Sequence, residues 1–170
     1  WSPVNHYISQ TLEGSEVNGF SGSWLSNVAT DFGVHHDLHA MLKSIGIRGT
    51  FVSPDQVING ELASSGFSTL LLPYSKGMSA AEASAITSFV SAGGLVVADN
   101  TPGIYTEHGA ALSPGSYRLD NLFPLNNQDN GINYGSGRAE YMHNGFNDYL
   151  DEQEAGSYAS ADQFAAILSQ

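Results

Sequence analysis

The residue types best suited to chemistry follow the apolar run Leu95–Ala98, in the turn Asn100-Thr101-Pro102-Gly103. In many enzymes with an open α/β sheet, a nucleophile sits on a tight turn directly after a strand. Thr101 carries the only hydroxyl of this turn, which contains no Ser or Cys. Thr101 is therefore either a nucleophile with His108 as its base or, as we favour, a turn residue that satisfies backbone groups.

Glu107 and His108 are a carboxylate beside an imidazole, the pairing used in general acid–base catalysis. Neighbours in sequence need not face one another, so we favour a pair that fixes a loop or lines an interface over a catalytic pair. Tyr105 precedes them and is one of several tyrosines among Asn, Asp and His, a mixture that suits sugar binding or a wet protein interface. We assign no catalytic residue and name these ligand or interface candidates: Asn100, Thr101, Tyr105, Glu107 and His108.

Two further clusters resemble metal sites. His35 and His39 are four residues apart, so one helix face can present both, but no third ligand is evident nearby. The acidic run Leu150–Glu154 lacks the spacing of a calcium loop, and a solvated segment is the favoured interpretation. We predict no metal, and no cofactor either, because no Gly-rich phosphate loop opens a helix.

Charge and composition exclude several classes of protein. The 170 residues contain 17 acidic and 5 basic side chains, a net charge of -12. This balance disfavours nucleic acid and anionic membranes as partners, and it suits a secreted or periplasmic protein. The chain has no cysteine, which excludes disulfides and thiolate chemistry. It begins at Trp1 and ends directly after a helical pattern, so we expect a piece of a longer protein.

The element that must position these residues is the stretch Ser68–Asn100. Two short apolar runs, Thr69–Leu72 and Leu95–Ala98, flank a helix with a capping box formed by Ser79 and Glu82. Continuous apolar strands joined by a helix predict a parallel pair buried on both faces. Ligands in such sheets bind outside the carboxyl ends of the strands.

The rest of the chain extends this pattern to a mostly parallel α/β sheet. Residues 126–147 have no periodicity, and we expect an irregular segment there. The first apolar run belongs to a predicted strand at Phe67–Leu72. The other predicted elements are strands at Pro3–Ser9 and Ile47–Val52, helices at Phe32–Ile45 and from Ser53 onward, and a closing helix at Ser160–Leu168 with a capping box of Ser160 and Gln163.

Four segments together resemble the middle domain of family-42-type β-galactosidases, the β-galactosidase trimerisation domain. The central segment has an apolar strand ending in Leu-Pro-Tyr, a helix after Ser-x-x-Glu, and a Gly-Gly turn into the next strand. The segments are LLLPYSKGMSAAEASAITSFVSAGGLVVADN at Leu70–Asn100, TEHGAAL at Thr106–Leu112, LDNLFPL at Leu119–Leu125 and HDLHAMLKSIGIRGTFV at His36–Val52. No pattern of the family matches the chain after Leu125.

The resemblance implies a three-layer flavodoxin-like fold, related to class-I glutamine amidotransferases, at residues 1–125. Residues 126–170 would be an irregular extension and closing helix of the same domain. In such enzymes this domain is not catalytic: it packs subunits into a trimer and helps to wall a neighbouring active site, while the catalytic glutamates lie in a separate barrel domain. The amidotransferase relatives carry a Cys where this chain has Asn100, so their chemistry is not implied.

We therefore expect a non-catalytic accessory and oligomerisation domain of a β-galactosidase-like glycoside hydrolase. Its partners would be other copies of itself, in a trimer, and an adjoining barrel domain. One alternative is a carbohydrate-binding or protein-interaction module built on residues 126–149, with galactose-containing sugars as ligands. The other is a free-standing hydrolase that uses Thr101 or the pair Glu107 and His108.

Overall fold

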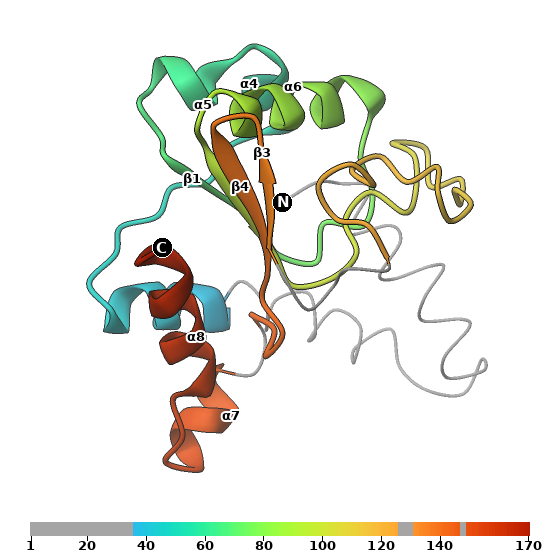
Figure 1. Ribbon diagram of the computed structural model, residues 1–170. Helices are drawn as coiled ribbons and strands as arrows, with labels where there is room; N and C mark the ends of the chain where they lie inside the picture. Colours follow the sequence, from blue (N-terminus) through green and yellow to red (C-terminus); the bar gives the residue numbers. More distant parts are fainter. Residues whose placement is uncertain (1–35, 126–130, 147–148) are drawn as a thin grey trace, which may run out of the picture. The chain divides into compact units, whose positions relative to one another are not determined.

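The computed structural model describes residues 36–125, 131–146 and 149–170, which fall into two compact units (Figure 1). The first unit includes residues 51–125 and 131–141, and it contains the sheet. The second includes residues 36–50, 142–146 and 149–170, and its regular structure in the described ranges is helical.

The sheet of the first unit has four strands in the order β1-β2-β4-β3. The strands are β1 (Thr69–Leu72), β2 (Leu95–Ala98), β3 (Ile132–Tyr134) and β4 (Gly137–Tyr141). β2 pairs in parallel with both β1 and β4, and β3 pairs with β4 antiparallel. The prediction of an α/β protein with a mostly parallel sheet is confirmed at this level.

Helix α6 (Ala80–Ser91) joins β1 to β2 as predicted. The Ser79 side chain accepts a hydrogen bond from the backbone of Glu82, and the Glu82 carboxylate accepts one from the backbone of Ser79, which completes the capping box. The apolar side of the helix is buried at four positions: Ala83, Ile86, Phe89 and Val90. The strand–helix–strand unit is therefore held by its cap at one end and by core packing along its length.

Two short helices, α4 (Pro54–Ile58) and α5 (Glu61–Ser64), precede β1. Ser53 and Gln56 form a capping box at the start of α4, and Pro54 occupies its first turn, as the sequence predicts. Figure 1 shows α4 and α6 on the same side of the sheet. The core on this side includes Leu70, Leu72, Val96, Ala98, Leu119, Leu122, Phe123, Ala139 and Tyr141.

The opposite face of the sheet also carries buried side chains. Val97 is fully buried, and the register places it beside Glu140 of β4. Glu140 is buried too, and it forms an ion pair with Arg138 two residues earlier on the same strand. A buried carboxylate is tolerated when it is paired in this way.

The prediction that residues 126–147 are irregular is wrong, because β3 and β4 form a hairpin there. Gly135 has a φ of 61° at the first position of its two-residue turn, a conformation that suits glycine. A Cβ at Gly135 would lie 2.5 Å from the carbonyl oxygen of Ser91, so the turn packs closely on the end of α6. The strand pattern was hidden because one face of β4 carries the ion-paired residues Arg138 and Glu140 instead of apolar residues.

The predicted strand at Ile47–Val52 is not formed. Residues 47–53 have no regular structure, and Phe51 keeps 71% of its surface exposed. The β-branched composition of this segment favours a strand only where a neighbouring strand is available to pair with it. The predicted strand at Pro3–Ser9 lies outside the described residues.

The second unit contains a helix over residues 36–44, with α7 (Tyr149–Glu154) and α8 (Ala159–Leu168). The first of these falls within the predicted helix Phe32–Ile45, and Gly46 ends it with a φ of 76°. The predicted capping box at Ser160 is wrong: α8 begins one residue earlier, and Ser160 instead donates from its backbone N–H and its hydroxyl to the two carboxylate oxygens of Glu152. Gln163 accepts from the backbone of Asn144.

Candidate functional site

The carboxyl ends of β1 and β2 are tied to each other. The backbone N–H of Tyr74 donates to Oδ1 of Asp99 across 2.7 Å. Tyr74 has a φ of 48° and is, among the described residues, the one non-glycine with a positive φ. The amino group of Lys76 lies 4.2 Å from the centre of the Tyr74 ring, a cation–π distance. Tyr74 is thus held in a conformation that side chains rarely adopt, and such strain is concentrated at functional or switch-like sites.

The segment after β2 returns to this edge through backbone hydrogen bonds. The N–H of Gly103 donates to the carbonyl of Ser75, and that of Tyr105 donates to the carbonyl of Lys76, each at 3.0 Å. Tyr105 also accepts from Met78, which leads into α6. Tyr105, one of the candidate residues, therefore has a structural role through its backbone at the start of the helix.

Asn100 and Thr101 are half-buried in the turn that follows β2. Neither residue has a positive φ, whereas a nucleophile elbow needs a sharp, strained turn at the nucleophile. In this unit the strained non-glycine backbone lies at Tyr74, after β1, and not after β2. The geometry does not bring Thr101 and His108 into a hydrogen bond, since His108 is exposed and its described contact is a backbone bond to Thr106 Oγ1.

Glu107 pairs with Arg118 and not with its sequence neighbour His108. A guanidinium nitrogen of Arg118 lies 3.6 Å from the Glu107 carboxylate, and Nε of Arg118 donates to the carbonyl of Met78 at 3.3 Å. The Arg118 backbone N–H donates to Gly103, whose missing Cβ would lie 2.6 Å from the Arg118 side chain. Arg118 thereby holds the segment 103–118 against the start of α6. Glu107 stabilises this arrangement by its ion pair with the Arg118 guanidinium.

The metal candidates lie only partly in the described ranges. His39 is exposed on its helix, and His35 lies outside the described residues. Within residues 36–125, 131–146 and 149–170, no three His, Asp or Glu side chains gather in a group that could hold a metal ion. In the acidic run, Glu152 is committed to Ser160, while Asp151 and Glu154 are exposed.

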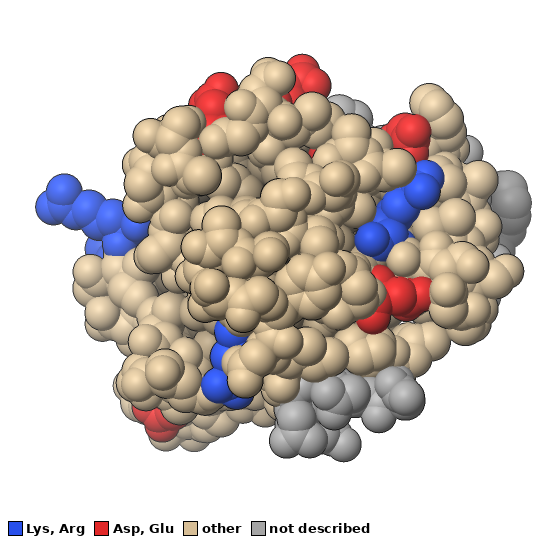
Figure 2. All heavy atoms as spheres, turned by 45° about the horizontal axis from the view of Figure 1, so that its top comes forward, with Lys and Arg blue, Asp and Glu red and all other residues tan. Residues whose placement is uncertain are grey.

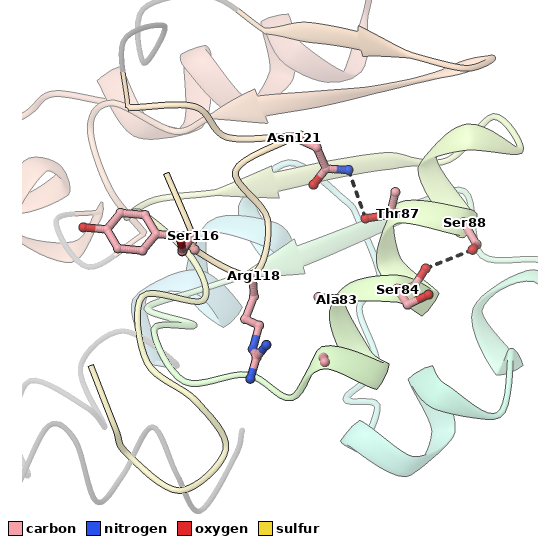
Figure 3. A pocket seen from close by; sticks show the side chains of 9 residues that line it. Ala83, Ser84, Thr87, Ser88, Ser116, Arg118 and Asn121 are labelled. Atoms are coloured by element: carbon pink, nitrogen blue, oxygen red, sulfur yellow. Dashed lines mark hydrogen bonds between the residues drawn. The ribbon is translucent and has the colours of Figure 1, made fainter. Parts of the chain in front are cut away.

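A groove opens between the exposed flank of α6 and residues 116–121, with a volume of about 380 Å³. Its lining includes Ser84, Thr87 and Ser88 of the helix, and Ser116, Arg118 and Asn121 of the facing segment (Figure 3). The side-chain amide of Asn121 donates to the hydroxyl of Thr87 at 3.3 Å, and the Ser88 hydroxyl donates to the carbonyl of Ser84 at 2.9 Å. Hydroxyl and amide groups therefore dominate its polar lining.

Sequence reasoning missed the tie between Tyr74 and Asp99, the fastening by Arg118 and the groove. No residue pattern in the sequence predicts that a tyrosine will adopt a positive φ. Arg118 had one available signal, because the chain carries only 5 basic residues and each is a candidate partner for the abundant carboxylates. The groove depends on a segment without regular structure that packs against α6. Such a contact cannot be predicted from the periodicity of the sequence.

Comparison with known proteins identifies no relative: no family model and no curated protein matches the sequence. None of the helices in the described ranges combines the length and the apolar character that a membrane crossing requires.

Proposed function

We propose that this chain is a non-catalytic accessory and oligomerisation domain of a β-galactosidase-like glycoside hydrolase. In this proposal the domain has the three-layer flavodoxin-like fold related to the amidotransferases. It packs subunits into a trimer and walls the active site of an adjoining barrel domain that carries the catalytic glutamates.

One observation carries the proposal: three polar side chains at the carboxyl edge of the sheet, those of Asp99, Thr106 and Glu107, are used to hold the fold. Asp99 accepts from the Tyr74 backbone, and Glu107 pairs with Arg118. The Thr106 hydroxyl accepts from two backbone N–H groups, those of His108 and Ala110. The turn at Asn100 offers no Ser or Cys for nucleophilic attack. An edge with this arrangement suits a domain that supports another active site.

The sequence resemblance supports the assignment to this family. The strand, helix and strand in which the resemblance is densest, Leu70–Asn100, coincide with β1, α6 and β2. The parallel pairing of β1, β2 and β4 is compatible with a flavodoxin-like layout, which also requires helices on both faces of the sheet.

The test of oligomerisation is the mass of the chain in solution. Sedimentation equilibrium over a wide concentration range should give a concentration-dependent mass that approaches three times that of one chain. A mass that stays at one chain up to the highest concentration, with no trimer of the parent enzyme, would overturn the oligomerisation role.

The test of the non-catalytic assignment is a panel of esters, amides and glycosides. We expect no turnover above that of buffer. If the chain turns over any of these and both Glu107→Gln and His108→Ala abolish that turnover, the chain is a hydrolase and the proposal is wrong. Turnover that Thr101→Ala abolishes would make the chain a hydrolase as well, whereas turnover unaffected by all three variants would point to a contaminating enzyme, which independently purified protein would lack.

A further inference from the structure

The groove beside α6 has the dimensions of a small-ligand site. Its volume of about 380 Å³ lies within the range of roughly 300–1,000 Å³ that such sites occupy. One wall is a helix anchored by its capping box and by the buried side chains Ile86 and Phe89. The other wall is fixed by the buried side chains Leu119 and Leu122. Both walls are therefore attached to the core, so the groove is formed before any ligand arrives.

The polar groups of the groove present both donors and acceptors. Because Asn121 donates to the Thr87 oxygen, the Thr87 hydroxyl proton can be donated to a ligand. Because the Ser88 hydroxyl proton is used by Ser84, the Ser88 oxygen offers its lone pairs. Ser116 contributes a further hydroxyl, which can do either. A ligand that alternates donors and acceptors along its own edge matches this arrangement.

The charge of the groove selects against ionic ligands. Among the described residues that line the groove, Arg118 is the one that carries a charge, and it is already paired with Glu107. The sole charged residue of α6, Glu82, is committed to the capping box. Figure 2 shows a face that is mostly uncharged, with separate Lys or Arg and Asp or Glu side chains on it. An anionic ligand would also approach against a net charge of -12, and a cation would find no carboxylate in the lining.

The composition of the groove is also unlike that of a protein interface. Protein interfaces are enriched in aromatic residues, Met and Arg, and they are depleted in Ser and Ala. Among the described residues that line this groove, two, Tyr117 and Arg118, belong to the enriched types, whereas five belong to the depleted types: Ala80, Ala83, Ser84, Ser88 and Ser116. A small polar ligand therefore fits the surface better than a second protein does.

We propose that the groove between α6 and residues 116–121 binds a neutral, polyhydroxylated ligand, a saccharide of one or two rings. Such a ligand supplies the alternating hydroxyl donors and acceptors that Thr87, Ser88, Ser116 and Asn121 complement. Binding is weak, since the groove is open to solvent and leaves much of the ligand hydrated. This site lies apart from residues 126–149, and it does not depend on the oligomeric state or on the parent enzyme proposed above.

The test is a nuclear magnetic resonance titration of the 170-residue chain with lactose and with maltose. We expect saturable shifts of the backbone amide signals of Thr87, Ser88, Ser116 and Asn121. Galacturonate, the charged control, should produce at least tenfold weaker binding. If the chain is monomeric and still binds lactose, this site is established and the proposed trimer is wrong.

Two matched variants locate the site. Ser84→Gln places a long side chain at the groove and should weaken lactose binding at least tenfold. Ala81→Gln places the same side chain on an exposed position of α6 that does not line the groove, and it should bind lactose as the unaltered chain does. Circular dichroism of both variants establishes that the fold is retained.

Three outcomes would overturn the proposal. The first is that neither sugar shifts the groove signals. The second is that the two glutamine variants bind the sugar equally well. The third is that the same signals shift with protein concentration alone, without sugar, which would make the groove a contact between copies of the chain.

Discussion

The backbone N–H of Tyr74 is hydrogen-bonded to the carboxylate of Asp99 at 2.7 Å, although the two residues are far apart in sequence. Tyr74 follows β1 and Asp99 follows β2, so this bond closes the carboxyl end of the parallel pair. It also holds the tyrosine at a φ of 48°. One carboxylate thus stabilises both the spacing of two strands and an unfavourable backbone conformation.

Removing this acceptor should be costly. Asp99→Ala leaves the Tyr74 N–H without its partner, and we expect the free energy of unfolding to fall by about 1–3 kcal/mol. Asp99→Asn keeps an oxygen at the same place and should lose less. Urea unfolding followed by circular dichroism measures both, and equal losses for the two variants would contradict the assigned role of the Asp99 oxygen.

The cap of α6 should contribute measurably to stability. Ser79→Ala removes the oxygen that accepts from the Glu82 backbone, and a loss of about 1 kcal/mol is expected in the free energy of unfolding. Ser84→Ala, in the exposed middle of the same helix, is the control and should cost nothing, because alanine is the better helix former. Thermal unfolding of the pair decides whether the effect belongs to the cap.

The hairpin turn should tolerate only glycine at position 135. Gly135→Ala adds a Cβ that meets the Ser91 carbonyl at 2.5 Å, at a position with a φ of 61°. Gly115→Ala is the matched control, since Gly115 also has a positive φ but nothing within 4 Å of its Cβ position. The control should lose about 1–2 kcal/mol from backbone strain alone, and Gly135→Ala should lose more. Similar melting temperatures for the two variants would show that the hairpin turn moves to accommodate the added Cβ, which would contradict the prediction.

The hydrogen bonding between Glu152 of α7 and Ser160 of α8 should be measurable as a coupling free energy. Ser160 donates twice to Glu152, at 2.8 Å in each case. In a double-mutant cycle, Glu152→Ala and Ser160→Ala should be coupled by about 0.5–3 kcal/mol. Glu154→Ala is the control, because Glu154 is exposed and no hydrogen bond of Ser160 involves it. Because Ser160→Ala keeps the backbone N–H, the coupling reports the hydroxyl bond alone, and a coupling near zero would mean that this bond does not help to hold the two helices together.

The strand–helix–strand unit could be predicted because each of its signals is local. The capping box of Ser79 and Glu82, the helical spacing of Ile86 and Phe89, and the apolar run Leu95–Ala98 all lie within one continuous stretch. Local propensity and tertiary burial agree there, and such agreement is what makes a pattern readable.

The failures occurred where distant contacts override local patterns. Ser160 is spaced from Gln163 as a cap would be, but Glu152 on the preceding helix competes for its hydroxyl and its N–H. Ile47–Val52 has the composition of a strand and lacks a partner strand in the described residues. At the candidate site, Glu107 and His108 looked like a pair in sequence, whereas Arg118 was the partner that the fold brought to Glu107.

The sheet order also sets the sequence of events when the chain folds. β1, α6 and β2 lie within residues 69–98 and can assemble through contacts that are close in sequence. β4 completes the parallel part of the sheet only after the whole segment 99–136 has been closed into a loop, which costs chain entropy before any of its pairing with β2 is gained. The docking of the hairpin on β2 is therefore expected to limit the folding rate, and until then the edge of β2 is left open to pairing with other chains.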